Sequence, residues 1–179
     1  MKMTDAQKDM YLAERVATEM RQYFIEKKIL PQDARSLDMD TLAAMVAAVG
    51  GTLMPIPEGA ESEEGVAYVE KDENDDSFTI YYAKPESENH VPYLSVLHEL
   101  GHAALHLDKH KKLACKGLGT IHDEADLFAR TLAMPRQIFE QVAVENLENG
   151  TFNLRNIVKT YREDYFQILQ RGQELKIWE

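Results

Sequence analysis

Cysteine is almost absent from this sequence, since Cys115 is the only one among 179 residues. No disulfide can therefore form within the chain, and we expect a protein of the reducing cytoplasm. We interpret Cys115 as an inert thiol on a loop rather than as a nucleophile. Long apolar runs are also lacking, because no stretch approaches the roughly 20 residues that span a bilayer. Residues 1–9 contain no apolar signal core, so we expect neither secretion nor contact with a membrane.

Basic residues are scarce as well. The chain has 20 Lys and Arg against 31 Asp and Glu, a formal net charge of −11. A protein that binds duplex DNA needs a basic face to neutralise phosphates. The longest basic cluster, residues 109–112, is short and typical of a solvated loop. We therefore expect no direct binding of nucleic acid, so that any effect on gene expression would act through another protein.

The most informative stretch is residues 98–102, HELGH in one-letter code, which fits the pattern H-E-x-x-H. Positions i and i+4 of an α-helix share a face, so His98 and His102 can direct two imidazoles at one metal ion. Glu99 lies about 100° further round the helix, where its carboxylate can reach a water on the metal without binding the metal itself. This pattern indicates a Zn²⁺ hydrolase in which the histidines are ligands and Glu99 is the general base.

Three fixed residues are a moderately specific signal, so the surrounding sequence matters. Pro92 suits the first turn of a helix. Val96, Leu100, Ala103 and Leu107 then form an apolar stripe opposite the two histidines. A surface helix that carries two histidines by chance is the alternative, and the stripe argues against it.

A catalytic zinc ion normally has a third protein ligand. The continuation H-E-x-x-H-x-x-G-x-x-H has Leu105 at the glycine position and Asp108 at the last one, and without glycine the helix does not turn Asp108 back. An acid from the next helix, residues 121–134, is the other source. Its candidates are Asp123, Glu124 and Asp126.

The helical period separates these acids. Phe128 lies at the centre of the apolar stripe of that helix, about 40° from Glu124 and about 160° from Asp126. Because an acid on a buried face needs a cation, we expect Glu124 to be the third zinc ligand. We expect Asp126 to pair with Arg130 at i+4.

The other histidines have less specific interpretations. We expect His106 to support or pack against the metal site rather than bind the metal, since three ligands in a row on one straight helix suit tetrahedral geometry poorly. We interpret His110 as exposed. His122 has two readings, an oxyanion stabiliser or a residue at the start of a helix, and we prefer the second.

The remaining periodicity predicts a mostly helical α+β fold with a short antiparallel or mixed sheet of about three strands beside the H-E-x-x-H helix. We expect a single domain made of an N-terminal helical extension (1–30), a catalytic core (31–135) and C-terminal helices (136–179). The predicted strands are 52–56, 66–70 and 77–83. We expect the last strand to form an edge of the sheet beside the cleft, where an extended peptide can be held by β-addition.

Two stretches resemble the ImmA/IrrE family of metallopeptidases. Residues 98–106 match its H-E-x-x-H-x-x-L-H helix, and residues 123–135 match its later E-A-N/D-x-F-A-x-x-L-L-M-P helix, with Ala133 where leucine is usual. The resemblance covers roughly residues 36–170. It implies a small α+β zincin in which His98, His102 and Glu124 match the metal ligands and Glu99 matches the general base.

Members of this family are often encoded on phages and mobile elements, and they inactivate helix-turn-helix repressors by cleaving them, directly or with a second factor. The resemblance therefore implies a stand-alone zinc-dependent endopeptidase whose substrate is a regulatory protein, expected to be a transcriptional repressor. The alternative is a zinc-containing regulatory protein that sequesters its partner without proteolysis, either as an anti-repressor or as a toxin or antitoxin component. The presence of Glu99 favours the enzyme, because a pure binding protein does not need a general base.

Overall fold

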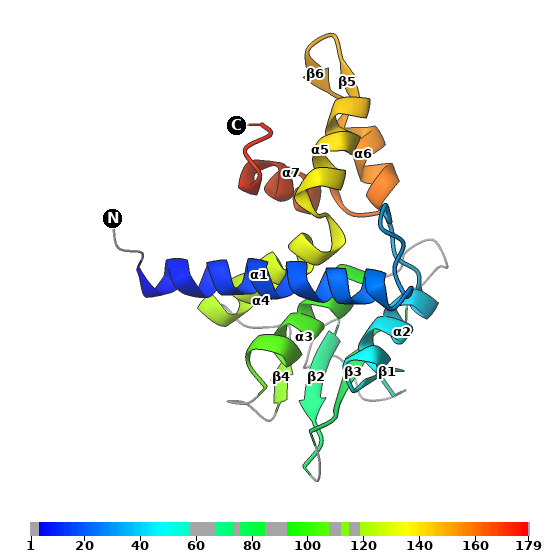
Figure 1. Ribbon diagram of the computed structural model, residues 1–179, viewed down its shortest axis with the longest axis vertical. Helices are drawn as coiled ribbons and strands as arrows, with labels where there is room; N and C mark the ends of the chain where they lie inside the picture. The colour runs from blue at the N-terminus through cyan, green and yellow to red at the C-terminus, as the bar shows by residue number, and fades with distance from the viewer. Residues whose placement is uncertain are drawn as a thin grey trace.

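The computed structural model describes residues 4–57, 67–73, 76–84, 93–107, 112–114 and 119–178. Helices dominate this part of the chain and accompany one small mixed sheet, so the predicted mostly helical α+β fold class is confirmed (Figure 1). None of the helices in these ranges combines the length and the apolar character needed to cross a membrane. The interpretations of Pro92, His110 and Cys115 fall outside the described residues.

The sheet has the strand order β1-β3-β2-β4. Its strands are β1 (Gly51–Pro55), β2 (Ala67–Lys71), β3 (Phe78–Tyr82) and β4 (Lys112–Ala114). β1 runs parallel to β3, whereas β2 runs antiparallel to both β3 and β4. The three strands expected from the sequence are present within one residue of their predicted ends. β4 lies where a loop was expected, because three residues are too few to show a period.

The prediction that β3 forms an edge of the sheet is wrong. β3 lies between β1 and β2, and its backbone is paired on both sides. The pairing with β1 is parallel, and a parallel partner is brought in through a long crossover that leaves no mark in the local sequence. Among the described strands, the edges are β1 and β4.

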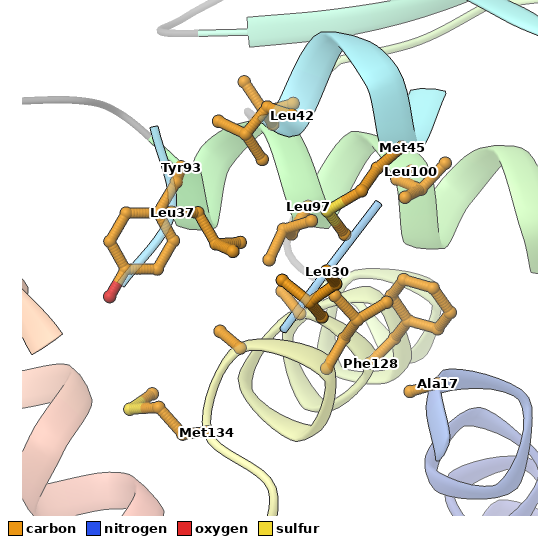
Figure 2. Close-up of a cluster of buried hydrophobic side chains, with 14 of the residues drawn as sticks. Ala17, Leu30, Leu37, Leu42, Met45, Tyr93, Leu97, Leu100, Phe128 and Met134 are labelled. Atoms are coloured by element: carbon orange, nitrogen blue, oxygen red, sulfur yellow. The ribbon is translucent and has the colours of Figure 1, made fainter. Parts of the chain in front are cut away.

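Four helices pack in layers on the sheet, and two of them contact its strands. The four helices are α1 (Asp5–Glu26), α2 (Met39–Ala48), α3 (Tyr93–Leu105) and α4 (Thr120–Ala133). α3 contacts β2 and β3 and also packs along α4, while α1 covers α4 and α2 contacts β1. The apolar side chains of α2, α3 and α4 meet in one core with Ala17 of α1, as Figure 2 shows.

Local signals in the sequence explain where several of these helices begin and end. Thr4 and Gln7 form a capping box at the start of α1, and the Asp38 side chain accepts a hydrogen bond from the Thr41 N–H at the start of α2. α2 ends before Gly50, which adopts a φ of 85° as a C-terminal glycine does. The face of α1 that carries Ala13, Ala17 and Phe24 is buried, as expected of a packing face.

Arg21 fastens α1 to the end of α4. Its side chain is buried, and its guanidinium donates to the carbonyl oxygens of Leu132 at 2.8 Å, Ala34 at 3.2 Å and Gln32 at 3.4 Å. Burial lowers the pKa of Arg21 to about 10, which still leaves the group charged at neutral pH. The carbonyls at a helix C-terminus favour such a cation.

The C-terminal part begins with α5 (Arg136–Glu145) and continues through a small hairpin to two further helices. The hairpin pairs β5 (Leu147–Glu148) with β6 (Thr151–Phe152), and the helices are α6 (Leu154–Tyr161) and α7 (Tyr165–Glu174). Asn149 and Gly150, a pair typical of hairpin turns, form the turn between these strands with φ angles of 49° and 79°. In Figure 1 these elements lie on the opposite side of α1 from the sheet.

Candidate metal centre

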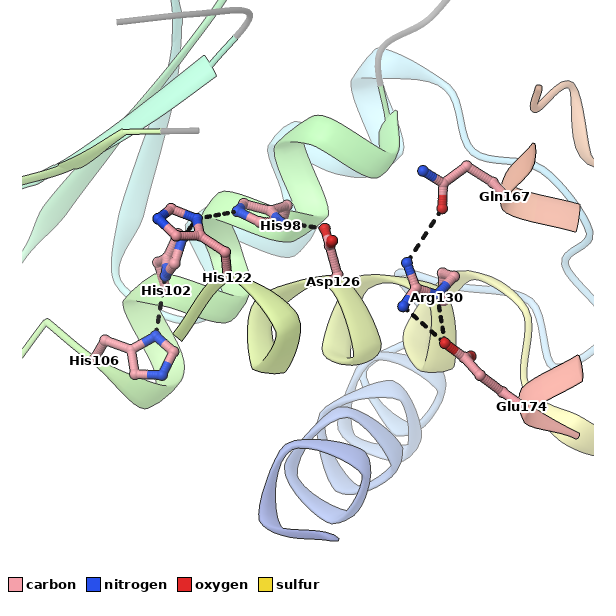
Figure 3. Close-up of polar contacts among 8 residues, drawn as sticks. All are labelled: His98, His102, His106, His122, Asp126, Arg130, Gln167 and Glu174. Atoms are coloured by element: carbon pink, nitrogen blue, oxygen red, sulfur yellow. Dashed lines mark hydrogen bonds and ion pairs between the residues drawn. The ribbon is translucent and has the colours of Figure 1, made fainter. Parts of the chain in front are cut away.

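Three histidines from two helices meet at one point. α3 presents His98 and His102 on one face, and the first turn of α4 places His122 opposite them (Figure 3). One ring nitrogen from each of the three lies within 4.8 Å of the others. Nδ1 of His122 is 3.1 Å from Nε2 of His102 and 3.3 Å from Nε2 of His98. These three histidines are close enough together to hold a metal ion.

The spacing of the nitrogens fits a tetrahedral ion. Zinc binds imidazole nitrogen at about 2.0–2.1 Å, so two nitrogens on a tetrahedral ion are about 3.3–3.4 Å apart. The distances from Nδ1 of His122 to the other two nitrogens, 3.1 and 3.3 Å, lie at or just below that value. A tetrahedral ion with three such ligands keeps one open position.

Asp126 orients the ring of His98. Its Oδ1 lies 2.7 Å from Nδ1 of His98. Burial raises the pKa of Asp126, but the hydrogen bond with His98 outweighs this effect and holds that pKa below its usual value. The ionised carboxylate accepts the Nδ1 proton, which leaves the Nε2 lone pair of His98 facing the centre. Burial lowers the pKa of His122, which favours its neutral, ligating form.

A longer chain of contacts orients the ring of His102. Nδ1 of His102 lies 3.0 Å from Nδ1 of His106, and Nε2 of His106 lies 2.9 Å from Oε2 of Glu124. An ionised carboxylate only accepts, so we assign the proton on Nε2 of His106 as the donor to Glu124. Nδ1 of His106 then accepts from Nδ1 of His102. This tautomer leaves the Nε2 lone pair of His102 facing the centre.

Only some of the predicted site residues lie together in the structure. His98 and His102 share one site, as expected, and their third neighbour is His122. His122 lies in the first turn of α4, as preferred from the sequence, but it was not expected to be a metal ligand. Glu124, the predicted third ligand, contacts His106 instead of joining the group of three. The expected pairing of Asp126 with Arg130 is replaced by the contact of Asp126 with His98.

The orientation of α4 explains this difference. A Cβ placed on Gly101 would lie 3.0 Å from Cδ1 of Phe128 and 3.2 Å from Cα of Ala125, so α3 meets α4 between those two residues. The flank beside Ala125, which carries His122 and Asp126, is thereby turned toward the histidines of α3. The spacing of His122 and Asp126, i and i+4, is the same as that of His98 and His102, and this repeated spacing was the available signal.

Glu99, the expected general base, is completely buried on α3 next to His98. The carboxylate is therefore held within the protein rather than on its surface.

A pocket of about 180 Å³ lies beside His98 and His122. It is lined by Leu94, Ser95 and His98 of α3, by His122, Asp126, Ala129 and Arg130 of α4, and by Gln167 of α7. Nη1 of Arg130 donates a hydrogen bond to Oε1 of Gln167 at 3.3 Å, and Nη2 of Arg130 forms an ion pair with Oε1 of Glu174 at 2.7 Å (Figure 3). α7 therefore closes the end of the pocket away from the histidines.

No protein-family model matches the sequence, and no curated protein matches it either. The resemblance of residues 98–106 and 123–135 to the ImmA/IrrE family thus stays a prediction from those motifs. The observations that bear on function are the geometry of the histidine centre and the chemistry of the residues around it.

Proposed function

We propose that this protein is a zinc metallopeptidase of the ImmA/IrrE type that cleaves a regulatory protein, with a helix-turn-helix repressor as the expected substrate. The observation that carries the proposal is the group formed by His98, His102 and His122. Hydrogen-bond partners accompany two of these rings and favour tautomers with a lone pair facing the centre. Such oriented imidazoles are typical of a metal site and have little use in a core without one.

Zinc is the metal that this set of donors suits best. Three imidazole nitrogens with one open position form the ligand set of many catalytic zinc sites. His98, His102 and His122 would hold the ion, in place of the two histidines and one glutamate that the family resemblance implies. A zinc ion there would supply the Lewis acidity for attack of water on an amide carbonyl.

The chain supplies the remaining groups that amide hydrolysis needs. Glu99 would accept the proton of the attacking water and pass it to the nitrogen of the leaving amine. The pocket beside His98 would receive a side chain of the substrate, with Leu94 and Ala129 as apolar wall. Ser95 and Gln167 would offer it hydrogen bonds.

The sheet offers a place for an extended substrate. Within the described part of the chain, β4 is paired only with β2, and α3 contacts β4. An extended segment of the substrate would add to this edge by β-addition, the role that the sequence had suggested for β3. The formal net charge of −11 also suits a basic partner such as a repressor better than it suits DNA.

The direct test is incubation of the purified, zinc-loaded protein with the repressor-like protein encoded by the neighbouring gene, followed by mass analysis. We expect discrete fragments that disappear after chelation of the metal and in a His122→Ala variant. A stable complex without fragments would favour the alternative, a zinc-containing protein that acts by sequestration. The presence of Glu99 in the motif is the reason why we rank proteolysis first.

A further inference from the structure

Glu124 and His106 form a pair that the proposed chemistry does not use. His106 is 5% exposed, the Glu124 side chain is 14% exposed, and the two are joined at 2.9 Å. A carboxylate and an imidazole are withdrawn from water only at a cost in free energy unless each satisfies the other. The pair has one further contact among the described histidines, the 3.0 Å approach of His106 to His102.

We propose that Glu124 and His106 are positioning residues, which fix the ring of His102 and its metal-facing nitrogen without binding the metal themselves. This inference rests on the proposed metal centre of His98, His102 and His122. Glu124 accepts the Nε2 proton of His106, which forces Nδ1 of His106 to act as an acceptor. His102 then donates from Nδ1 and keeps its lone pair on Nε2, toward the centre.

The arrangement on α4 supports this reading. Two acids two residues apart on that helix each reach one of the α3 ligands: Asp126 contacts His98 directly, and Glu124 reaches His102 through His106. His106 lies four residues after His102, so its ring lies on the same side as that of His102. From there it contacts both His102 and Glu124. For Glu124 to bind the metal instead, its carboxylate would have to leave His106, whose buried Nε2–H would lose its acceptor.

The experiment compares metal binding in four variants: Glu124→Gln, Glu124→Ala, His106→Phe and His122→Ala. Zinc affinity is measured by competition with a chromophoric chelator, and the visible spectrum of the cobalt-substituted protein reports the donor set. We expect Glu124→Gln to stay within about threefold of wild type, because its amide oxygen still accepts from His106. Glu124→Ala and His106→Phe should weaken zinc by about 10–100-fold with an unchanged cobalt spectrum. His122→Ala should weaken zinc further and alter the spectrum.

Two results would overturn the positioning role. If Glu124→Ala alters the cobalt spectrum as His122→Ala does, or Glu124→Gln loses as much affinity as Glu124→Ala, the carboxylate is itself a ligand. If Glu124→Ala and His106→Phe both keep wild-type affinity, the pair does nothing for the metal. Should His106→Phe fail to fold, the comparison of the two Glu124 variants still decides. A wild-type protein that binds no zinc would instead contradict the proposed function.

Discussion

Gly101 sets the distance between the two helices that build the metal centre, and Gly101→Ala tests that role. The added Cβ would lie 3.0 Å from Cδ1 of Phe128 and 3.2 Å from Cα of Ala125. Carbon atoms pack best at about 3.5–4.0 Å, so α4 has to move away from α3 by roughly half an ångström. The Phe128 ring can adjust, but the backbone at Ala125 can only move together with α4.

Two opposing effects decide the stability of this variant. Alanine gains about 0.8–1.0 kcal/mol over glycine inside a helix. Overpacking a tight core contact costs about 1–3 kcal/mol. We therefore expect the free energy of unfolding of Gly101→Ala to fall by about 0–2 kcal/mol, measured by urea denaturation of the metal-free protein. Since His122 moves with α4, we also expect zinc affinity to fall by about tenfold or more.

Ala104 supplies the matched control, because it lies on the exposed side of the same helix. Ala104→Gly should cost about 0.5–1 kcal/mol of stability through helix propensity alone and should leave zinc affinity unchanged. The close-contact argument would be refuted if Gly101→Ala gained as much stability as Ala104→Gly loses and still bound zinc as tightly as wild type.

Three further predictions concern charged groups. Burial raises the pKa of Glu163 from its ordinary value of 4.5 to about 8. Between these two values the folded state holds a proton that the unfolded chain releases, so stability falls as pH rises through that window. Glu163→Gln should therefore have little effect on urea unfolding at about pH 4 and should stabilise the protein at about pH 8.5; an equal effect at both would contradict this. Arg21→Met should lower the free energy of unfolding by about 2–4 kcal/mol, because three backbone carbonyls lose a charged donor, while the exposed Arg15→Met should change it by under about 0.5 kcal/mol. Asp126→Ala should weaken zinc by about 10–100-fold in chelator competition, and unchanged affinity would show that His98 needs no partner.

Local features of the sequence predict the secondary structure well. The capping box of Thr4 and Gln7, the glycine at position 50 and the Asn149–Gly150 turn each depend on neighbours within a few residues, and all three are present in the structure. The apolar stripe of α3 places Val96 and Leu100 in the core, as expected, with the two histidines on another face. These features follow from side-chain chemistry and backbone period alone.

Relations between distant elements were harder to predict. The position of β3 inside the sheet depends on a parallel partner, β1, that no nearby residue reveals. Glu124 was predicted as the third zinc ligand because Phe128 was taken as the centre of the buried face of α4. The contact of Gly101 with both Ala125 and Phe128 rotates that face and brings His122 to the histidines of α3. The way in which two helices face each other is a packing outcome, which a single helix does not encode.

The most direct test of the proposed peptidase is the Glu99→Gln variant, assayed against the repressor beside the wild-type protein. Glutamine keeps the shape of the buried Glu99 but cannot accept the proton of the attacking water. We predict that Glu99→Gln folds, keeps its zinc and still binds the repressor, while the rate of cleavage falls by about 10²–10⁴-fold. If Glu99→Gln relieves repression in cells as well as wild type does, or cuts the repressor at the wild-type rate, general-base proteolysis by this centre is contradicted.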